Sequence, residues 1–298
     1  MQKWPTVTND LDLNEGKINF TTRTGDEVTI KAIWQDTLPL GSHEGTIFAI
    51  HGSPGSHNDF KYIAHYLKKT GIRVIAMNMP GHGYTQKHKK IGFENEDRNA
   101  FLQAMLDHLQ IEGPIVFVGH SRGSENAMAI YAQGIKPFFI IQFASWIYNV
   151  NLWSVQKMIM HPILYHVYKR IVRLKTQTGK IAAVCVQSMR TFGLEKQRPY
   201  VEELNENSKT PIVMAYSGKD FLIEDQIVRE MLAEFDGAEE LILDDSKSDD
   251  VEAKAARWVR QRLLESRALG VCFKQDGHYL QKFKAKFLAD TIATMCQL

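Results

Sequence analysis

The sequence predicts an α/β protein in which a mostly parallel central sheet is flanked by helices. Short apolar runs rich in β-branched residues alternate with segments whose apolar residues recur at helical spacing, an order typical of parallel strand pairing. One run, residues 115–120, leads directly into a serine between two glycines. The 298 residues and their 44% hydrophobic content suffice for one domain over 1–298 with an inserted subdomain.

The first elements expected are the two strands of a hairpin over residues 17–35, with a tight turn at residues 24–26. Apolar residues alternate along both arms: Ile18 and Phe20 on the first, and Val28, Ile30 and Ile33 on the second. We expect this hairpin to form an antiparallel edge of the sheet.

The alternation of strands and helices follows the hairpin. Before the glycine-flanked serine, the patterns predict strands at 46–50 and 73–77, with helices at 60–67 and 97–109. After it they predict a helix from Arg122, strands at 137–143, 211–216, 241–243 and 270–273, helices around 227–235 and 251–263, and a terminal helix from Tyr279.

Residues 146–209 break this alternation. They are rich in aromatic residues and methionine, are helix-like, and lack the rhythm of strands and turns. From 147 to 198 they carry nine basic residues and one acid, a net charge of +8, whereas residues 202–252 carry sixteen acids and four bases, a net charge of −12. We interpret 146–209 as a helix-like segment inserted into the domain.

Ser121 is the predicted nucleophile. In the pattern Gly-x-Ser-x-Gly the serine occupies a sharp turn from strand to helix, and Gly119 and Gly123 leave room for backbone that side chains would block. A helix that begins at Arg122 directs its positive dipole end at the serine, which favours a negative charge developing there.

Four short stretches resemble the α/β-hydrolase superfamily: residues 51–55 (His-Gly-Ser-Pro-Gly), 80–83 (Pro-Gly-His-Gly), 119–123, and 276–278 (Asp-Gly-His) together with residue 220. The resemblance implies the α/β-hydrolase fold with a helical cap, which the superfamily usually inserts at the position that residues 146–209 occupy. It also implies that His278 is the catalytic base, and that backbone N–H groups of Ser53 and Arg122 form the oxyanion hole.

Asp220 is the predicted acid, because it closely follows the strand at 211–216. Asp225 and Glu224 lie nearby as rivals. The superfamily's other acid position, after the preceding strand, falls at residues 143–146 and has no carboxylate.

Three features depart from the superfamily pattern. Asn78 stands where many relatives have an aspartate, Gly-x-Asp at 218–220 is one residue shorter than the common spacing, and residues 237–268 are longer than a minimal connection. None of them removes a predicted catalytic group.

The resemblance and the residues together predict a serine hydrolase that cleaves carboxylic esters of an apolar acyl substrate through an acyl-enzyme, with thioesters and amides as alternatives. Relatives that open epoxides or displace halides use an aspartate at the position of Ser121, which argues against those reactions. The rival hypothesis is a non-catalytic protein of the same fold that binds a small hydrophobic ligand.

Other classes find little support. We expect no cofactor and no metal, because no His, Cys or acidic cluster has ligand spacing, and no nucleic acid or obligate protein partner. Three scattered cysteines and the absence of a visible secretory signal predict a soluble, cytoplasmic protein. Lys169, Arg170 and Arg173 in the basic cap predict weak contact with anionic membrane surfaces.

Overall fold

A central sheet dominates the computed structural model, which describes residues 12–132, 139–143, 197–207, 211–220, 222–244, 250–266 and 268–298. Within these ranges the strands are β1 (Leu13–Thr21), β2 (Glu27–Asp36), β3 (Thr46–Ile50), β4 (Arg73–Met77), β5 (Ile115–His120), β6 (Phe139–Phe143), β7 (Ile212–Ser217), β8 (Glu239–Leu243) and β9 (Ala268–Phe273). They form one sheet in the order β1-β2-β4-β3-β5-β6-β7-β9-β8. All neighbours are parallel except β1 with β2 and β2 with β4.

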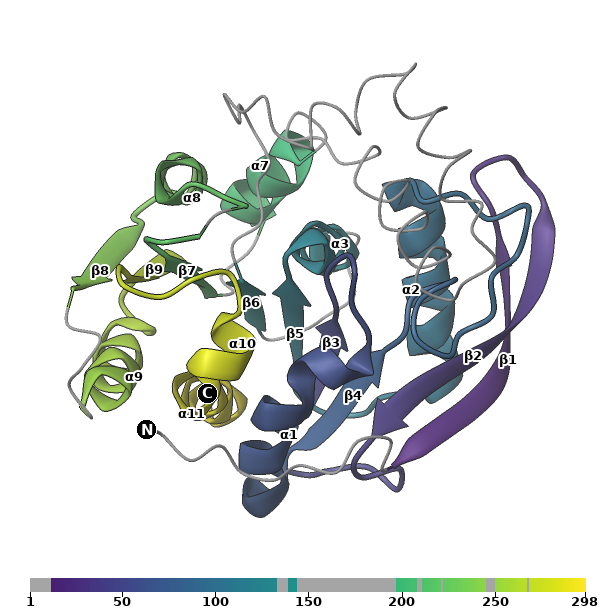
Figure 1. Ribbon diagram of the computed structural model, residues 1–298, viewed down its shortest axis with the longest axis horizontal. Coiled ribbons are helices and arrows are strands. Elements are labelled where there is room, and N and C mark those ends of the chain that lie inside the picture. Colours follow the sequence, from purple (N-terminus) through teal and green to yellow (C-terminus); the bar gives the residue numbers. More distant parts are fainter. Residues whose placement is uncertain are drawn as a thin grey trace.

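Helices connect the strands. They are the 3-10 helices η1 (His57–Phe60) and η2 (Lys68–Thr70) and the α-helices α1 (Lys61–Leu67), α2 (Asn95–Leu109), α3 (Arg122–Ala132), α7 (Arg198–Asn207), α8 (Asp225–Ala233), α9 (Val251–Arg262), α10 (Leu280–Phe283) and α11 (Ala285–Cys296). Figure 1 shows that they cover both faces of the sheet, with α1, α9 and α11 on one face and α2, α3, α7 and α8 on the other.

Alternate residues of the central strands supply the cores on these two faces. In β3, Ile47 and Ala49 pack with α1 and α11, whereas Phe48 and Ile50 pack with α2 and α3. All four side chains are fully buried, as expected for a parallel sheet that helices cover on both sides. The predicted fold class is therefore confirmed.

The predicted hairpin is confirmed, with one difference in its pattern. Thr21 pairs with Glu27 at the end nearest the turn, and Ile18 and Ile30 are buried partners on adjacent strands. Ile33 is only partly buried, because side chains along a strand alternate and Trp34 occupies the core-facing position next to it.

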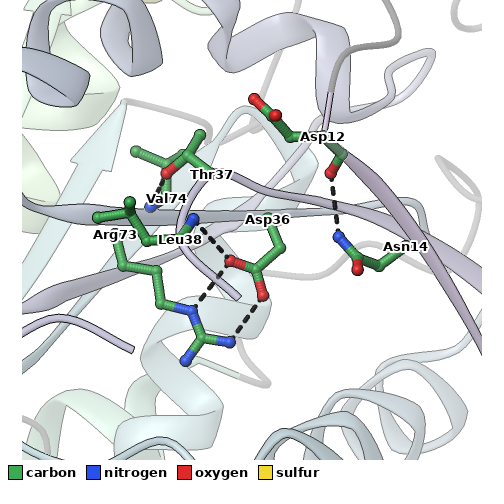
Figure 2. Close-up of polar contacts among 7 residues, drawn as sticks. All are labelled: Asp12, Asn14, Asp36, Thr37, Leu38, Arg73 and Val74. Carbon is green, nitrogen blue, oxygen red and sulfur yellow. Dashed lines mark hydrogen bonds and ion pairs between the residues drawn. The ribbon is translucent and has the colours of Figure 1, made fainter. Parts of the chain in front are cut away.

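A buried ion pair ties the end of β2 to the start of β4 (Figure 2). The Asp36 carboxylate accepts two hydrogen bonds from the Arg73 guanidinium, at 3.0 and 2.6 Å, and both side chains are buried. Next to it, Thr37 Oγ1 accepts a hydrogen bond from the Val74 N–H at 2.9 Å. These contacts hold the antiparallel hairpin in register against the parallel strands.

The predicted cap, residues 146–209, lies outside the described residues except for 197–207, of which Arg198–Asn207 form α7. Lys169, Arg170 and Arg173, which the membrane prediction invokes, also lie outside them. In the part of the chain that the structure does describe, no helix is both long and apolar enough to cross a bilayer.

Candidate active site

Ser121 lies at the turn between β5 and α3, in the middle of the sheet. Its φ angle is 50°, in the left-handed region that side-chain-bearing residues seldom adopt. That conformation costs roughly 1–2 kcal/mol, so the surrounding structure must hold the serine in it. The residue is 7% exposed.

Both glycines of the motif are required by close backbone contacts. A Cβ atom at Gly123 would lie 2.1 Å from the carbonyl oxygen of Ile50, and one at Gly119 would lie 2.4 Å from Cα of Ser124. Neither neighbour can move aside, because each is backbone of a buried element. The steric reason predicted for the two glycines is therefore confirmed.

His278 and Asp220 form a hydrogen-bonded pair at the ends of neighbouring strands. Nδ1 of His278 and Oδ2 of Asp220 are 2.8 Å apart, and both side chains are almost fully buried. Because Asp220 follows β7 and His278 follows β9, the parallel pairing of these strands brings the two loops together. Ser217 Oγ strengthens this link by donating to the Gly277 carbonyl at 2.8 Å.

The backbone fixes the orientation of the Asp220 carboxylate. Its Oδ1 accepts hydrogen bonds from the N–H groups of Leu222 and Ile223, at 2.8 and 3.1 Å, which leaves Oδ2 directed at His278. The rivals lie elsewhere: Asp225 is 3.3 Å from Arg229 on the next turn of α8, and Glu224 is exposed. Among the three predicted acids, the structure pairs Asp220 with the histidine.

His278 also lies close to the strand that carries the serine. Its ring centroid is 5.2 Å from that of His120, the residue before Ser121. His120 is itself held at Nδ1, 3.5 Å from Asp59 and 3.3 Å from the amide nitrogen of Gln281. The structure therefore brings the predicted base and acid to the end of β5 that bears Ser121.

The loop after β3 lies against the serine from the other side. A Cβ atom at Gly52 would be 2.8 Å from Cβ of Ser121, so only glycine permits this approach. The Gly52 carbonyl accepts a hydrogen bond from His51 Nδ1 at 2.6 Å. Since C=O and N–H point in opposite directions in a trans peptide, this bond directs the Ser53 N–H away from His51.

Two histidine rings in tilted contact adjoin this loop. The ring centroids of His51 and His82 are 5.0 Å apart, and His51 Nε2 accepts the Met79 N–H at 3.0 Å. Burial lowers the pKa of His51 well below its usual value and that of His82 to about 3. Both rings are therefore neutral at pH 7, and His51 keeps the tautomer that donates to Gly52.

The backbone and the side chain of Arg122, the residue after the serine, occupy two different environments. Its backbone N–H lies in the first turn of α3, where helices leave N–H groups without partners inside the helix. Its guanidinium is fully buried and forms an ion pair with Glu125 one turn on. Glu125 in turn accepts a hydrogen bond from the Asn95 amide at the start of α2.

The sequence analysis missed a second buried arginine beside this network. Arg98, on α2, donates from Nε to Oδ1 of Asn126 on α3 at 2.7 Å, and it is 3% exposed. A signal was present: Arg98 shares a helical face with the apolar core residues Phe101, Leu102 and Met105. A charged residue on an apolar face could have been recognised.

Asn78, the first departure from the superfamily pattern, joins three elements. Its Oδ1 lies 2.9 Å from the His57 backbone nitrogen and 3.0 Å from His57 Nδ1, and its Nδ2 donates to the Ile33 carbonyl at 2.9 Å. An aspartate could not make the last bond, because an ionised carboxylate only accepts. The amide is therefore required by this contact with β2.

We expect Asn78→Asp to lower the free energy of unfolding by about 3 kcal/mol, because it sets a carboxylate oxygen against the Ile33 carbonyl in a buried site. Urea denaturation of both proteins measures this change. Asn19→Asp is the control: Asn19 is exposed and accepts from Thr29 Oγ1, so an added charge there should change stability by less than about 0.5 kcal/mol. Equal effects of the two variants would show that the Asn78 amide is dispensable.

Within the described residues, no group of three or more His, Cys, Asp or Glu side chains is arranged to hold a metal ion. The site there consists of a strained serine, a His–Asp pair, a loop packed on the serine and a buried polar network between α2 and α3.

Comparisons with known proteins agree with this architecture. A family model described as alpha/beta hydrolase of unknown function (DUF1057) matches residues 11–297. An uncharacterized protein of Caenorhabditis elegans, F35H12.5, is 27% identical over 315 residues, which cover 95% of this chain and 87% of the worm protein.

Solved structures extend the comparison to the fold. An esterase from Exiguobacterium antarcticum has a TM-score of 0.62 at 13% identity, covering 95% of this chain and all of the esterase. A loop variant of a haloalkane dehalogenase from Bradyrhizobium elkanii has a TM-score of 0.64 at 11% identity, covering 96% of this chain and 97% of the other. At such low identity these likenesses concern the fold alone.

Proposed function

Because the chain belongs to the alpha/beta hydrolase family DUF1057, we propose that it is a serine hydrolase that cleaves carboxylic esters through an acyl-enzyme. The observation that carries the proposal is the hydrogen bond of 2.8 Å between His278 and Asp220, at the carboxyl ends of the parallel strands, where Ser121 is held in a left-handed conformation. A protein that only binds a ligand has no need of all three groups.

In the proposed reaction His278 is the base. Its Nδ1–H donates to Asp220, and its Nε2 takes the proton of the Ser121 hydroxyl as Oγ attacks the ester carbonyl carbon. The imidazolium then gives that proton to the alcohol oxygen as the C–O bond breaks. Water hydrolyses the acyl-enzyme by the same path: His278 takes a proton from the water and returns it to Ser121 Oγ as the acid leaves.

The oxyanion formed in each step would be bound by the N–H groups of Ser53 and Arg122. The bond from His51 to Gly52 supports this role for Ser53, because it fixes the direction of the donor peptide. Fixed donors of this kind typically lower the barrier by about 3 kcal/mol each. The buried, neutral His51 is thus a positioning residue in the proposal.

The proposed substrate is an ester with an apolar acyl group, an expectation that comes from the aromatic and methionine-rich composition of residues 146–209. Thioesters and amides remain chemically accessible to the same groups. In the structural comparisons, an esterase from Thermogutta terrifontis and a thioesterase domain from the curacin biosynthetic pathway are both similar in fold.

The test is a panel of acyl esters, thioesters and amides of increasing acyl length, assayed by release of the free acid. We expect turnover of esters by the wild-type protein and none by Ser121→Ala. A protein that binds members of the panel, with protection against thermal unfolding but without turnover, would instead be the non-catalytic binder.

A further inference from the structure

Arg98 is a buried cation that forms no ion pair within the part of the chain that the structure describes. The only hydrogen bond of its side chain within the described residues goes to the neutral Asn126 amide, and its Nη2 atom is buried with no partner there. Burial lowers the pKa of Arg98 to about 10, so the side chain still carries its charge at pH 7. An ion buried without a partner is strongly destabilising.

The buried acids of the two helices that enclose Arg98 are committed elsewhere. Asp97 accepts hydrogen bonds from the backbone N–H groups of Arg23 and Gly92, both at 2.6 Å. Glu125 is paired with Arg122 and with the Asn95 amide. In the described network between α2 and α3, two arginines, Arg98 and Arg122, therefore face one carboxylate, Glu125, which leaves one positive charge in excess.

This charge lies against the helix that begins directly after Ser121, because Arg98 is bonded to Asn126 on α3. The charge of Arg98 helps to lower the pKa of both His51 and His82, whose rings contact each other next to the loop that carries Ser53. The Nε2 atom of His82 is also buried without a hydrogen-bond partner among the described residues. Arg98 and His82 thus present unused donor or acceptor atoms in the same region.

The strand order indicates which part of a substrate this region would meet. β3 and β4 carry the loops of His51 and His82 on one side of β5, whereas β7 and β9 carry Asp220 and His278 on the other. The leaving alcohol takes its proton from His278, so it departs on the β9 side. The acyl portion would then remain on the side of β3 and β4, the side on which α2, the helix of Arg98, packs against β1.

We propose that Arg98 binds an anionic group on the acyl portion of the substrate, a carboxylate, so that the preferred substrates are half-esters of dicarboxylic acids. This inference rests on the proposed function. A carboxylate supplies the missing charge and pairs with a guanidinium through two hydrogen bonds.

The test compares each half-ester with the diester of the same diacid, from succinate to suberate, because the two differ by one charge on the same chain. We expect wild-type kcat/KM to favour the half-ester at the best-fitting length by about 100-fold. Arg98→Met should remove that preference while the diester is still hydrolysed, and Arg98→Lys should keep part of it. Arg257→Met, at an exposed ion pair on α9, is the control and should behave as wild type.

A second measurement does not depend on turnover. The free diacid should raise the thermal unfolding temperature of the wild type and of Arg257→Met but not of Arg98→Met. In the absence of ligand, the stability of Arg98→Met should equal or exceed that of the wild type, because the substitution removes an unpaired buried charge. An arginine needed only for packing predicts the opposite: a less stable variant with an unchanged preference.

The outcomes separate this inference from the proposed function. Hydrolysis of diesters that depends on Ser121, with no preference for half-esters, would overturn the role of Arg98 alone. Binding of the protein to anionic vesicles at low salt, together with equal turnover of half-ester and diester, would overturn it as well and assign the basic charge to a membrane surface. If the wild-type protein hydrolyses no ester at all, the proposed function itself is overturned.

Discussion

Ser121→Ala should abolish both covalent labelling by a fluorophosphonate probe and hydrolysis of esters. The probe requires an oxygen nucleophile that attacks phosphorus and displaces fluoride, and an ordinary serine hydroxyl reacts too slowly to be labelled. Ser121 is set apart by its position: it is held at a φ of 50° at the end of β5, beside a histidine that is bonded to a carboxylate. Removing only Oγ removes the attacking atom and leaves the backbone unchanged.

Gel fluorescence after labelling measures the first effect, and a loss of turnover by several orders of magnitude measures the second. Ser42→Ala is the control, because Ser42 lies in the loop between β2 and β3, distant from Ser121 in the sequence, and its hydroxyl donates to the Gly71 carbonyl. If the alanine variant at position 121 labels as strongly as the control, another residue is the nucleophile.

Much of the sheet could be predicted from the sequence because its central strands are buried on both faces. Such strands appear as continuous apolar runs, and the predicted bounds of β3 and β4 agree with the structure residue for residue. The glycines around Ser121 were equally predictable, since only glycine permits the contact of Gly123 with the Ile50 carbonyl. In both cases the residue type that the local pattern predicts is also the one that the tertiary contacts require.

The order of the strands and the buried polar network could not be predicted in this way. β9 lies between β7 and β8, although β8 comes first along the chain. Likewise, the first turn of α2 is almost wholly buried, although residues such as Asn95, Asp97 and Asn99 would be assigned to solvent from their polarity. Their burial depends on partners on other elements, which periodicity does not identify.

The acid was predicted from its place after β7, but its geometry adds a reason why it cannot be replaced by an amide. In Asp220→Asn, the side-chain oxygen would stay with the N–H groups of Leu222 and Ile223, because both are donors. The amide NH₂ must then face His278 and donate to Nδ1. The proton of the imidazole is thereby moved to Nε2, where it blocks acceptance of the Ser121 proton.

We therefore expect Asp220→Asn to lower kcat by about four orders of magnitude while thermal stability changes little, since a wrong tautomer costs about that much in a triad of this kind. Asp225→Asn is the matched control on the next helix. Asp225 is paired with Arg229 and is partly exposed, so its replacement should change kcat by less than about twofold. The same steady-state assay decides between the two acids. A large loss in Asp225→Asn with an active Asp220→Asn would make Asp225 the orienting carboxylate and would require the loop after β7 to rearrange before catalysis.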